Sequence, residues 1–201
     1  MSNVLILFAH PRLQNSRTHS RLIQEAQNSH KVTVHDLYEA YPDFDIDVEH
    51  EQKIMLNHDI IILQHPFYWY SAPPILKQWI DLVLKHGWAY GHKGKTLTGK
   101  KIMNVLSTGG RQEAYQKDGF NKFTIREFLS PFEQTARLCN MIYLPPFVVH
   151  GTHLASNEEI ESATQLYQIL LKNLVEDKLP YDEIVTKNYM NEVLSDITPL
   201  K

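Results

Sequence analysis

Four aromatic residues follow one another in the middle of the chain, Phe67-Tyr68-Trp69-Tyr70, between Pro66 and the pair Pro73-Pro74. Proline fixes its own φ and lacks a backbone donor, so both ends of this loop are stiff. Aromatic side chains in a core usually pack on aliphatic neighbours, and that explanation suffices for one or two of them. Consecutive loop residues face opposite ways, however, so we expect at least one ring to be exposed and able to stack on a flat aromatic ligand.

A second polar group lies near the amino terminus and consists of His10 and the triplet Ser16-Arg17-Thr18. Helical spacing begins directly after Ser16, a favoured N-cap residue. Backbone N–H groups at a helix start, together with Ser and Thr hydroxyls, bind phosphate well. His10 could add a further donor, although a histidine bonded to a loop carbonyl explains it equally well.

A third group is Ser107-Thr108-Gly109-Gly110, which follows an aliphatic run. Glycine has no Cβ and therefore lets the backbone approach a planar ring closely, although Thr-Gly-Gly also occurs in many ordinary turns. A phosphate site, an aromatic wall and a glycine-lined edge together suit flavin mononucleotide (FMN) or the corresponding half of FAD.

Other ligand motifs are missing from the sequence. It contains neither a Gly-x-Gly-x-x-Gly run nor a Gly-x-x-x-x-Gly-Lys-Ser/Thr run, which argues against a Rossmann dinucleotide site and a P-loop. Its 11 histidines form no close His-x-x-x-His set and accompany no Cys-x-x-Cys pair, so we expect no metal site.

The elements that must position these groups alternate between strand and helix patterns. We expect five strands, at Val4–Phe8, Lys31–Leu37, Asp59–Leu63, Lys101–Leu106 and a proline-interrupted Met141–Val149. We expect helices from Ser16, from near Val48, from Pro73-Pro74, over Phe123–Cys139 and over Glu158–Leu174. Alternation of this kind predicts an α/β fold with a doubly wound, five-stranded parallel sheet, and we favour strand order 2-1-3-4-5.

This strand order predicts where the three groups meet. In an open parallel sheet, ligands bind at the carboxyl ends of the strands where the winding direction reverses, here between the first and third strands. The loops His10–Thr18 and Gln64–Ser71 then become neighbours, and Ser107–Gly110 lies one strand further along.

Composition narrows the class of protein. The 201 residues suit one flavin-binding domain over residues 1–175, with an acidic extension of unknown role over 176–201. A net charge of -3 gives no basic field for nucleic acid or anionic membranes. The single Cys139, the strand that begins directly after Asn3 and the lack of a long apolar stretch lead us to expect a cytoplasmic protein that does not insert into the membrane itself.

These motifs resemble the flavodoxin-like NAD(P)H:quinone oxidoreductase family over Val4 to about Leu174. His10 with Ser16, the run from Gln64 to Asp81, and Ser107–Gly110 carry the resemblance. The segments Tyr41–Asp47, His86–Gly91 and Leu144–Phe147 are most similar to the ancillary subunits of glutathione-gated Kef potassium-efflux systems.

The resemblance implies a flavin held by His10, with Ser16–Thr18 at its phosphate, Phe67–Tyr70 along its ring and Ser107–Gly110 at its edge. Tyr115 matches a family tyrosine that manages charge during hydride transfer, whereas Asn121 stands where larger relatives carry a histidine. In the family's homodimer, Trp88, Tyr90 and His92 would lie over the partner subunit's flavin.

The implied activity is the two-electron reduction of quinones or related electrophiles by NAD(P)H, with ping-pong kinetics. The protein would also activate a Kef-type potassium/proton antiporter, which would hold it at the inner face of the membrane. Two alternatives remain open: a regulatory binding subunit with incidental reductase activity, and a stress-response quinone reductase without a membrane partner. A flavodoxin-like electron carrier fits the fold, but the aromatic residues Trp88–Tyr90 disfavour it.

Overall fold

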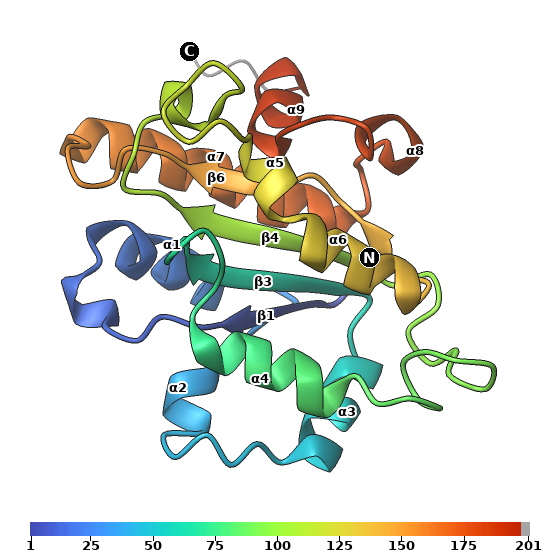
Figure 1. Cartoon of the computed structure of the whole chain (residues 1–201). Coiled ribbons are helices and arrows are strands. Elements are labelled where there is room, and N and C mark those ends of the chain that lie inside the picture. The colour runs from blue at the N-terminus through green and yellow to red at the C-terminus, as the bar shows by residue number, and fades with distance from the viewer. Residues whose placement is uncertain (198–201) are drawn as a thin grey trace.

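A parallel sheet forms the centre of the protein in the computed structural model, which describes residues 1–197 (Figure 1). Its strands are β1 (Val4–Phe8), β2 (Val32–Asp36), β3 (Ile60–Pro66), β4 (Lys101–Ser107), β5 (Ile142–Tyr143) and β6 (Phe147–Val149). The order is β2-β1-β3-β4-β5, and β6 also pairs with β4. The expected fold class and strand order are confirmed.

Helices cover both faces of this sheet. They are α1 (Arg17–Gln27), α2 (Leu37–Ala40), α3 (Val48–Leu56), α4 (Pro74–Val83), α5 (Ile125–Phe128), α6 (Ser130–Leu138), α7 (Asn157–Glu176), α8 (Tyr181–Ile184) and α9 (Met190–Ile197). Alternate residues of β1 point to opposite faces: Val4, Ile6 and Phe8 pack with α1 and α7, while Leu5 and Leu7 pack with α3 and α4. All five residues of β1 are fully buried, as a central parallel strand requires.

Several boundaries differ from the sequence expectation. The third strand extends beyond Leu63 to Pro66, because Gln64, His65 and Pro66 still pair with β4. The helix expected over residues 123–139 is two helices, since α5 ends before Leu129 and α6 begins anew with Pro131 in its first turn. The short helix α2 was not expected; its N-cap Asp36 accepts hydrogen bonds from the amides of Tyr38 and Glu39.

The far edge of the sheet is divided and covered. Pro145 and Pro146 lack the N–H groups that a continuous strand needs, so β5 and β6 pair with separate stretches of β4. After α7, the chain returns to this edge, where the Met190 amide donates to the Pro146 carbonyl at 2.9 Å and the Asn191 amide group bonds both the N–H and C=O of Val148. The last four residues of the expected extension, 198–201, lie outside the described residues. No helix within residues 1–197 is long and apolar enough to cross a membrane.

One buried carboxylate joins four elements on the α3–α4 face. Glu51 is fully buried and accepts hydrogen bonds from Tyr41 Oη at 2.6 Å, His35 Nε2 at 2.7 Å and Trp79 Nε1 at 2.6 Å. Burial raises the pKa of Glu51, but the hydrogen bonds from His35, Tyr41 and Trp79 together outweigh burial and hold the pKa below its ordinary value. The cluster therefore ties β2, the loop after α2, α3 and α4 together as long as Glu51 is ionised.

Replacement of this carboxylate should destabilise the fold. We predict that Glu51→Gln lowers the free energy of unfolding by about 2 to 3 kcal/mol at pH 7, because an amide cannot accept all three buried donors. Glu49→Gln, on the exposed side of the same helix, is the matched control. Urea denaturation followed by circular dichroism measures both changes.

The pH dependence supplies a second readout. The unfolded chain takes up the Glu51 proton near the ordinary value of 4.5, whereas the folded chain takes it up at a lower pH. The stability that Glu51 contributes is therefore present above pH 4.5 and is lost as the pH falls through its folded pKa. Equal losses in Glu51→Gln and Glu49→Gln at pH 7, or a loss in Glu51→Gln that is independent of pH, would contradict this account.

Candidate functional site

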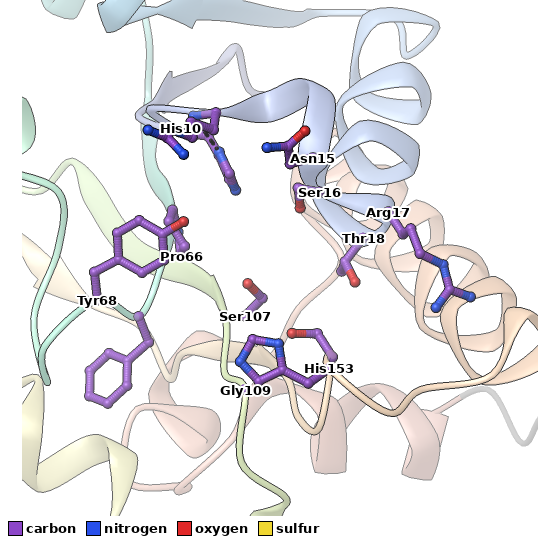
Figure 2. A pocket seen from close by; sticks show the side chains of 13 residues that line it. His10, Asn15, Ser16, Arg17, Thr18, Pro66, Tyr68, Ser107, Gly109 and His153 are labelled. Carbon is purple, nitrogen blue, oxygen red and sulfur yellow. Dashed lines mark hydrogen bonds between the residues drawn. The ribbon is translucent and has the colours of Figure 1, made fainter.

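A cavity of about 320 Å³ opens where β1, β3 and β4 end (Figure 2). The residues that line it come from the last positions of β3 and β4, from the loops after β1, β3 and β4, from the start of α1 and from the loop after β6. They are His10, Arg12, Asn15, Ser16, Arg17, Thr18, Pro66, Phe67, Tyr68, Ser107, Gly109, Thr152 and His153. The three groups singled out in the sequence thus meet at one cavity.

The start of α1 forms one end of this cavity. Ser16 is the N-cap, and its Oγ accepts a hydrogen bond from the His19 amide at 3.1 Å, while the Ser20 amide bonds the Ser16 carbonyl. Helix geometry leaves the amides of Arg17 and Thr18 without an intrahelical acceptor. With the positive end of the helix dipole behind them, these amides suit an anionic group.

The Arg17 guanidinium has a different role from its backbone. It donates to the Ala155 carbonyl at 3.1 Å and to Asn157 Oδ1 at 2.8 Å, so it holds the start of α7 against α1. The Arg17 guanidinium is therefore engaged with protein, and Arg17 faces the cavity mainly through its place at the helix start, where the sequence predicts a contribution from its backbone N–H.

His10 follows β1, and its hydrogen bonding indicates a single tautomer of the ring. Its Nδ1 accepts a hydrogen bond from the Arg12 amide at 3.1 Å, shown as a dashed line in Figure 2. Burial lowers the pKa of His10 below its ordinary value of 6.5. The neutral ring must therefore carry its proton on Nε2, which makes His10 an uncharged donor beside the cavity.

The aromatic run divides between the cavity and the surface. Residues 68–71 form a tight turn in which the Ser71 amide bonds the Tyr68 carbonyl at 3.0 Å, and both central residues, Trp69 and Tyr70, have positive φ. Phe67 and Tyr68 line the cavity, whereas Trp69 is 93% exposed. Tyr70 stacks on the ring of Phe128, with 5.1 Å between centroids.

A buried histidine fixes the strand end before this run. His65 Nδ1 bonds the Pro66 carbonyl at 3.0 Å, and His65 Nε2 bonds Asn104 Nδ2 at 3.0 Å. Asn104 Oδ1 in turn accepts from Tyr143 Oη at 2.6 Å. Burial lowers the pKa of His65 to about 4, so this chain of neutral groups holds Pro66 and hence the position of Phe67.

The loop after β4 supplies the opposite wall. Ser107 and Gly109 line the cavity, while the hydroxyl of the buried Thr108 donates to the Gly110 carbonyl at 2.8 Å and also bonds His150 Nδ1 at 3.1 Å. A Cβ on Gly109 would lie 2.4 Å from the His153 imidazole, so that ring stands directly over the glycine.

Tyr115 lies behind this wall rather than in the cavity lining. Its ring packs 5.9 Å from the ring of Phe67, and a Cβ on Gly110 would meet Tyr115 Oη at 3.5 Å. Burial raises the pKa of Tyr115, while the Thr108 hydroxyl partly offsets that rise. The phenol is therefore a protonated donor group at neutral pH.

The residues expected to complete a partner's site lie elsewhere in the chain. Trp88 and Tyr90 are half-buried and pack against the α3–α4 core, and His92 is exposed. Contacts within one chain thus already cover part of Trp88 and Tyr90. Their place in a dimer stays a prediction.

Sequence reasoning missed five cavity residues: Arg12, Asn15, Pro66, Thr152 and His153. Thr152 and His153 follow β6, and the rule that ligands bind at strand carboxyl ends could have indicated them. Within residues 1–197, no group of three His, Cys, Asp or Glu side chains is arranged to hold a metal ion.

Comparisons with known proteins agree with the fold described above. A family model described as "Flavodoxin-like fold" matches residues 2–171. The ancillary protein KefG of the glutathione-regulated potassium-efflux system of Serratia proteamaculans is 44% identical over 170 residues, which cover 85% of this chain and 93% of that protein.

Two solved structures are also similar. The general stress protein 14 of Treponema denticola, in complex with FMN, shares 43% identity with a TM-score of 0.82 and covers 86% of this chain and 99% of its own. An NADPH-quinone reductase from P. pentosaceus shares 38% identity with a TM-score of 0.78 and covers 85% and 98%.

The tautomer and charge of His10 can be tested directly. We predict that nitrogen NMR of labelled protein finds His10 protonated on Nε2 and not on Nδ1 at pH 7, with a titration midpoint below 6.5, because burial disfavours the cation. The spectrum of His10→Gln assigns the signals. A cationic His10 at pH 7, or a proton on Nδ1, would refute this prediction.

Proposed function

Since this chain belongs to the flavodoxin-like fold family, we propose that it is a flavin-dependent oxidoreductase that reduces quinones or related electrophiles with NAD(P)H. The observation that supports this most directly is the cavity, which combines a helix N-terminus, neutral His10, the rings of Phe67 and Tyr68, and the backbone of Gly109. These parts match the anionic, planar and edge portions of a flavin.

FMN is the cofactor that we propose. Its phosphate would bind the amides of Arg17 and Thr18 and the Nε2–H of His10, and its ring would lie between Tyr68 and Gly109. The similar protein from Treponema denticola was solved with FMN. A bound flavin supplies hydride chemistry, since it can accept a hydride from a nicotinamide and then pass two electrons to a quinone.

The chain itself orients the reactants and supplies hydrogen bonds. Phe67 and Tyr68 would fix the plane of the ring, and Tyr115 would donate from behind the Gly109-Gly110 backbone to charge that develops at the ring edge. Thr108 holds the carbonyl of Gly110 in place. Because the nicotinamide and the quinone would occupy the same space in turn, we expect ping-pong kinetics.

A second copy of the chain would complete the substrate pocket. Trp69 is held out into solvent by two consecutive residues with positive φ, a backbone conformation that costs energy for aromatic residues. Such an exposed ring beside the cavity suits an interface with a partner subunit. We propose that the partner's Trp88, Tyr90 and His92 lie over the flavin in the homodimer.

Flavin binding at Gly109 can be tested by filling the space beside it. We predict that Gly109→Val lowers FMN occupancy and quinone reduction at least about tenfold, because the added methyl groups would occupy the space of the ring. Absorbance spectra, the mass of the released cofactor and NAD(P)H-dependent turnover measure the effect.

The control for this variant follows from the position of His153. A side chain at position 109 also collides with the His153 imidazole, so the double variant Gly109→Val with His153→Ala removes that collision. The double variant should still lack flavin, while His153→Ala alone should fold and keep it. Recovery of full flavin occupancy in the double variant would show that the ring does not lie at Gly109.

We further propose that the protein is an ancillary activator of a Kef-type potassium/proton antiporter at the inner face of the membrane. Several similar proteins are named as ancillary proteins of potassium-efflux systems. Asp43 and Asp45 are exposed on the loop after α2 and are free for a basic surface, whereas Asp47 is engaged as the N-cap of α3. Charge complementarity of this kind mainly sets partner choice and association rate.

Charge reversal distinguishes this role from that of a reductase without a membrane partner. We predict that co-expression with a Kef-type antiporter raises potassium efflux, and that Asp43→Lys with Asp45→Lys lowers that rise several-fold while quinone turnover is unchanged. Asp182→Lys with Glu183→Lys, an equal charge change on exposed positions of α8, is the control. If potassium efflux is the same with and without the protein, the antiporter role is wrong and only the reductase function remains.

A further inference from the structure

A chain of buried polar side chains leads from α7 to the cavity wall and has no part in the function described above. Tyr167 Oη donates to Gln64 Oε1 at 2.7 Å, Gln64 Nε2 lies 3.5 Å from His19 Nδ1, and His19 Nε2 lies 3.0 Å from Ser107 Oγ. Tyr167, Gln64 and His19 are fully buried, and Ser107 lines the cavity. The contacts join α7, β3, α1 and the end of β4.

The direction of every hydrogen in this chain follows from its buried end. Gln64 Oε1 is the one acceptor that the described structure gives the Tyr167 hydroxyl, and a buried O–H without an acceptor is costly. The carbonyl oxygen of Gln64 therefore faces Tyr167, and its NH₂ group faces His19. Since that NH₂ group can donate but not accept, His19 Nδ1 must be an acceptor without a proton.

The ring of His19 then determines the state of Ser107. Complete burial lowers the pKa of His19 well below 6.5, and the nearby His10 and His65 add to the effect, so the ring is neutral. Its single proton lies on Nε2 and is donated to Ser107 Oγ. Because His19 Nε2 carries a proton, it cannot accept the Ser107 hydroxyl hydrogen. That hydrogen is then available for donation into the cavity.

The position of Ser107 indicates what this hydrogen meets. His19 lies in the first turn of α1 and its amide bonds Ser16 Oγ, so the Ser107 hydroxyl lies beside the helix start that suits an anion. In Figure 2 Ser107 lies between Ser16 and Thr18 on one side and Gly109 and His153 on the other. The Ser107 hydrogen therefore adds a donor to the amides at this end of the cavity.

We propose that His19 is a positioning residue which, held by Gln64 and Tyr167, makes Ser107 an obligate hydrogen-bond donor to a phosphate oxygen of the cofactor. The inference rests on the proposed flavin function and deepens it. It predicts selectivity as well as affinity: FMN should gain from the Ser107 hydrogen, whereas riboflavin, which has no phosphate, should not.

The test compares FMN and riboflavin binding to apo-protein by flavin fluorescence quenching. Ser107→Ala should weaken FMN binding about tenfold, because a hydrogen bond to a charged group is lost. Tyr167→Phe, which removes a hydroxyl remote from the cavity, should weaken FMN binding about threefold, because Gln64 can then reverse and release the His19 tautomer. Riboflavin affinity should stay unchanged in both variants.

The double variant Ser107→Ala with Tyr167→Phe shows whether Tyr167 acts on FMN binding through Ser107 or only through the general stability of the protein. With Ser107→Ala already present, Tyr167→Phe should have no further effect on FMN affinity, since the hydroxyl that Tyr167, Gln64 and His19 orient is then absent. Tyr143→Phe is the matched control, because Tyr143 also donates one 2.6 Å hydrogen bond to a buried amide, Asn104, but outside this chain of contacts. That variant should not change the preference for FMN over riboflavin.

Nitrogen NMR of His19 gives a readout that does not need the cofactor. In wild-type apo-protein His19 should carry its proton on Nε2, and Tyr167→Phe should yield a mixture of tautomers. Three results would overturn the inference: a proton on His19 Nδ1 in the wild type, an equal loss of FMN and riboflavin affinity in the variants, or additive effects in the double variant. Each of these results would still be compatible with the proposed flavin function. Absence of FMN binding to the wild type would overturn both the inference and the proposed function.

Discussion

The pairing of β1 with both β2 and β3 is the constraint on which the rest of the structure depends. Phe8 pairs with Asp36 on one side and with Gln64 on the other, so the chain leaves β1 and β3 at the same edge of the sheet. Crossovers from β1 and β3 lead outward in opposite directions, which leaves the space between the two strand ends open. His10, Phe67 and Ser107 meet there because parallel strands bring their carboxyl ends together.

Buried polar side chains fix this edge from below. One chain, from Tyr143 through Asn104 and His65, ends at the Pro66 carbonyl and sets the start of the aromatic loop. The other, from Tyr167 through Gln64 and His19, ends at Ser107. Each side chain has a partner within a closely packed interior, so neither strand end can shift without leaving a buried donor or acceptor unpaired. Contacts within the protein therefore hold the cavity wall at the ends of β3 and β4.

The α3–α4 face of the sheet holds a third buried polar cluster, which stabilises the fold rather than the cavity. Glu51 accepts three hydrogen bonds from three separate elements and remains ionised in a buried position. The acidic loop between α2 and α3 is anchored by Tyr41 at one end and by the N-cap Asp47 at the other, which leaves Asp43 and Asp45 exposed between fixed points. None of the residues of that loop lines the cavity, so a partner could bind the loop without contacting the cavity.

Much of the fold and part of the site could be predicted from the sequence. The aliphatic runs, the N-cap Ser16 and the prolines around the aromatic loop act over a few residues, so periodicity and local propensity identified β1, α1 and α4. The alternation of strands and helices predicted the sheet order, and the residue types in three loops at the strand ends predicted eight of the residues that line the cavity. The division of a long amphipathic stretch into α5 and α6 follows from a local signal, Pro131, that sequence reasoning did not use. The extension of β3 through Pro66 depends instead on pairing with β4, which no local pattern shows.

Only the tertiary structure decided where each of these side chains points and which groups it contacts. Trp69 points into solvent while Phe67 and Tyr68 face the cavity, and Arg17 turns its charge to α7. His153 and the buried partners Gln64, His19 and Tyr167 come from four distant segments. Hydrogen-bond direction and side-chain contact depend on distances of a few ångströms between residues far apart in the chain. A linear sequence specifies which groups are available, but the packing of helices on the sheet determines which of them meet.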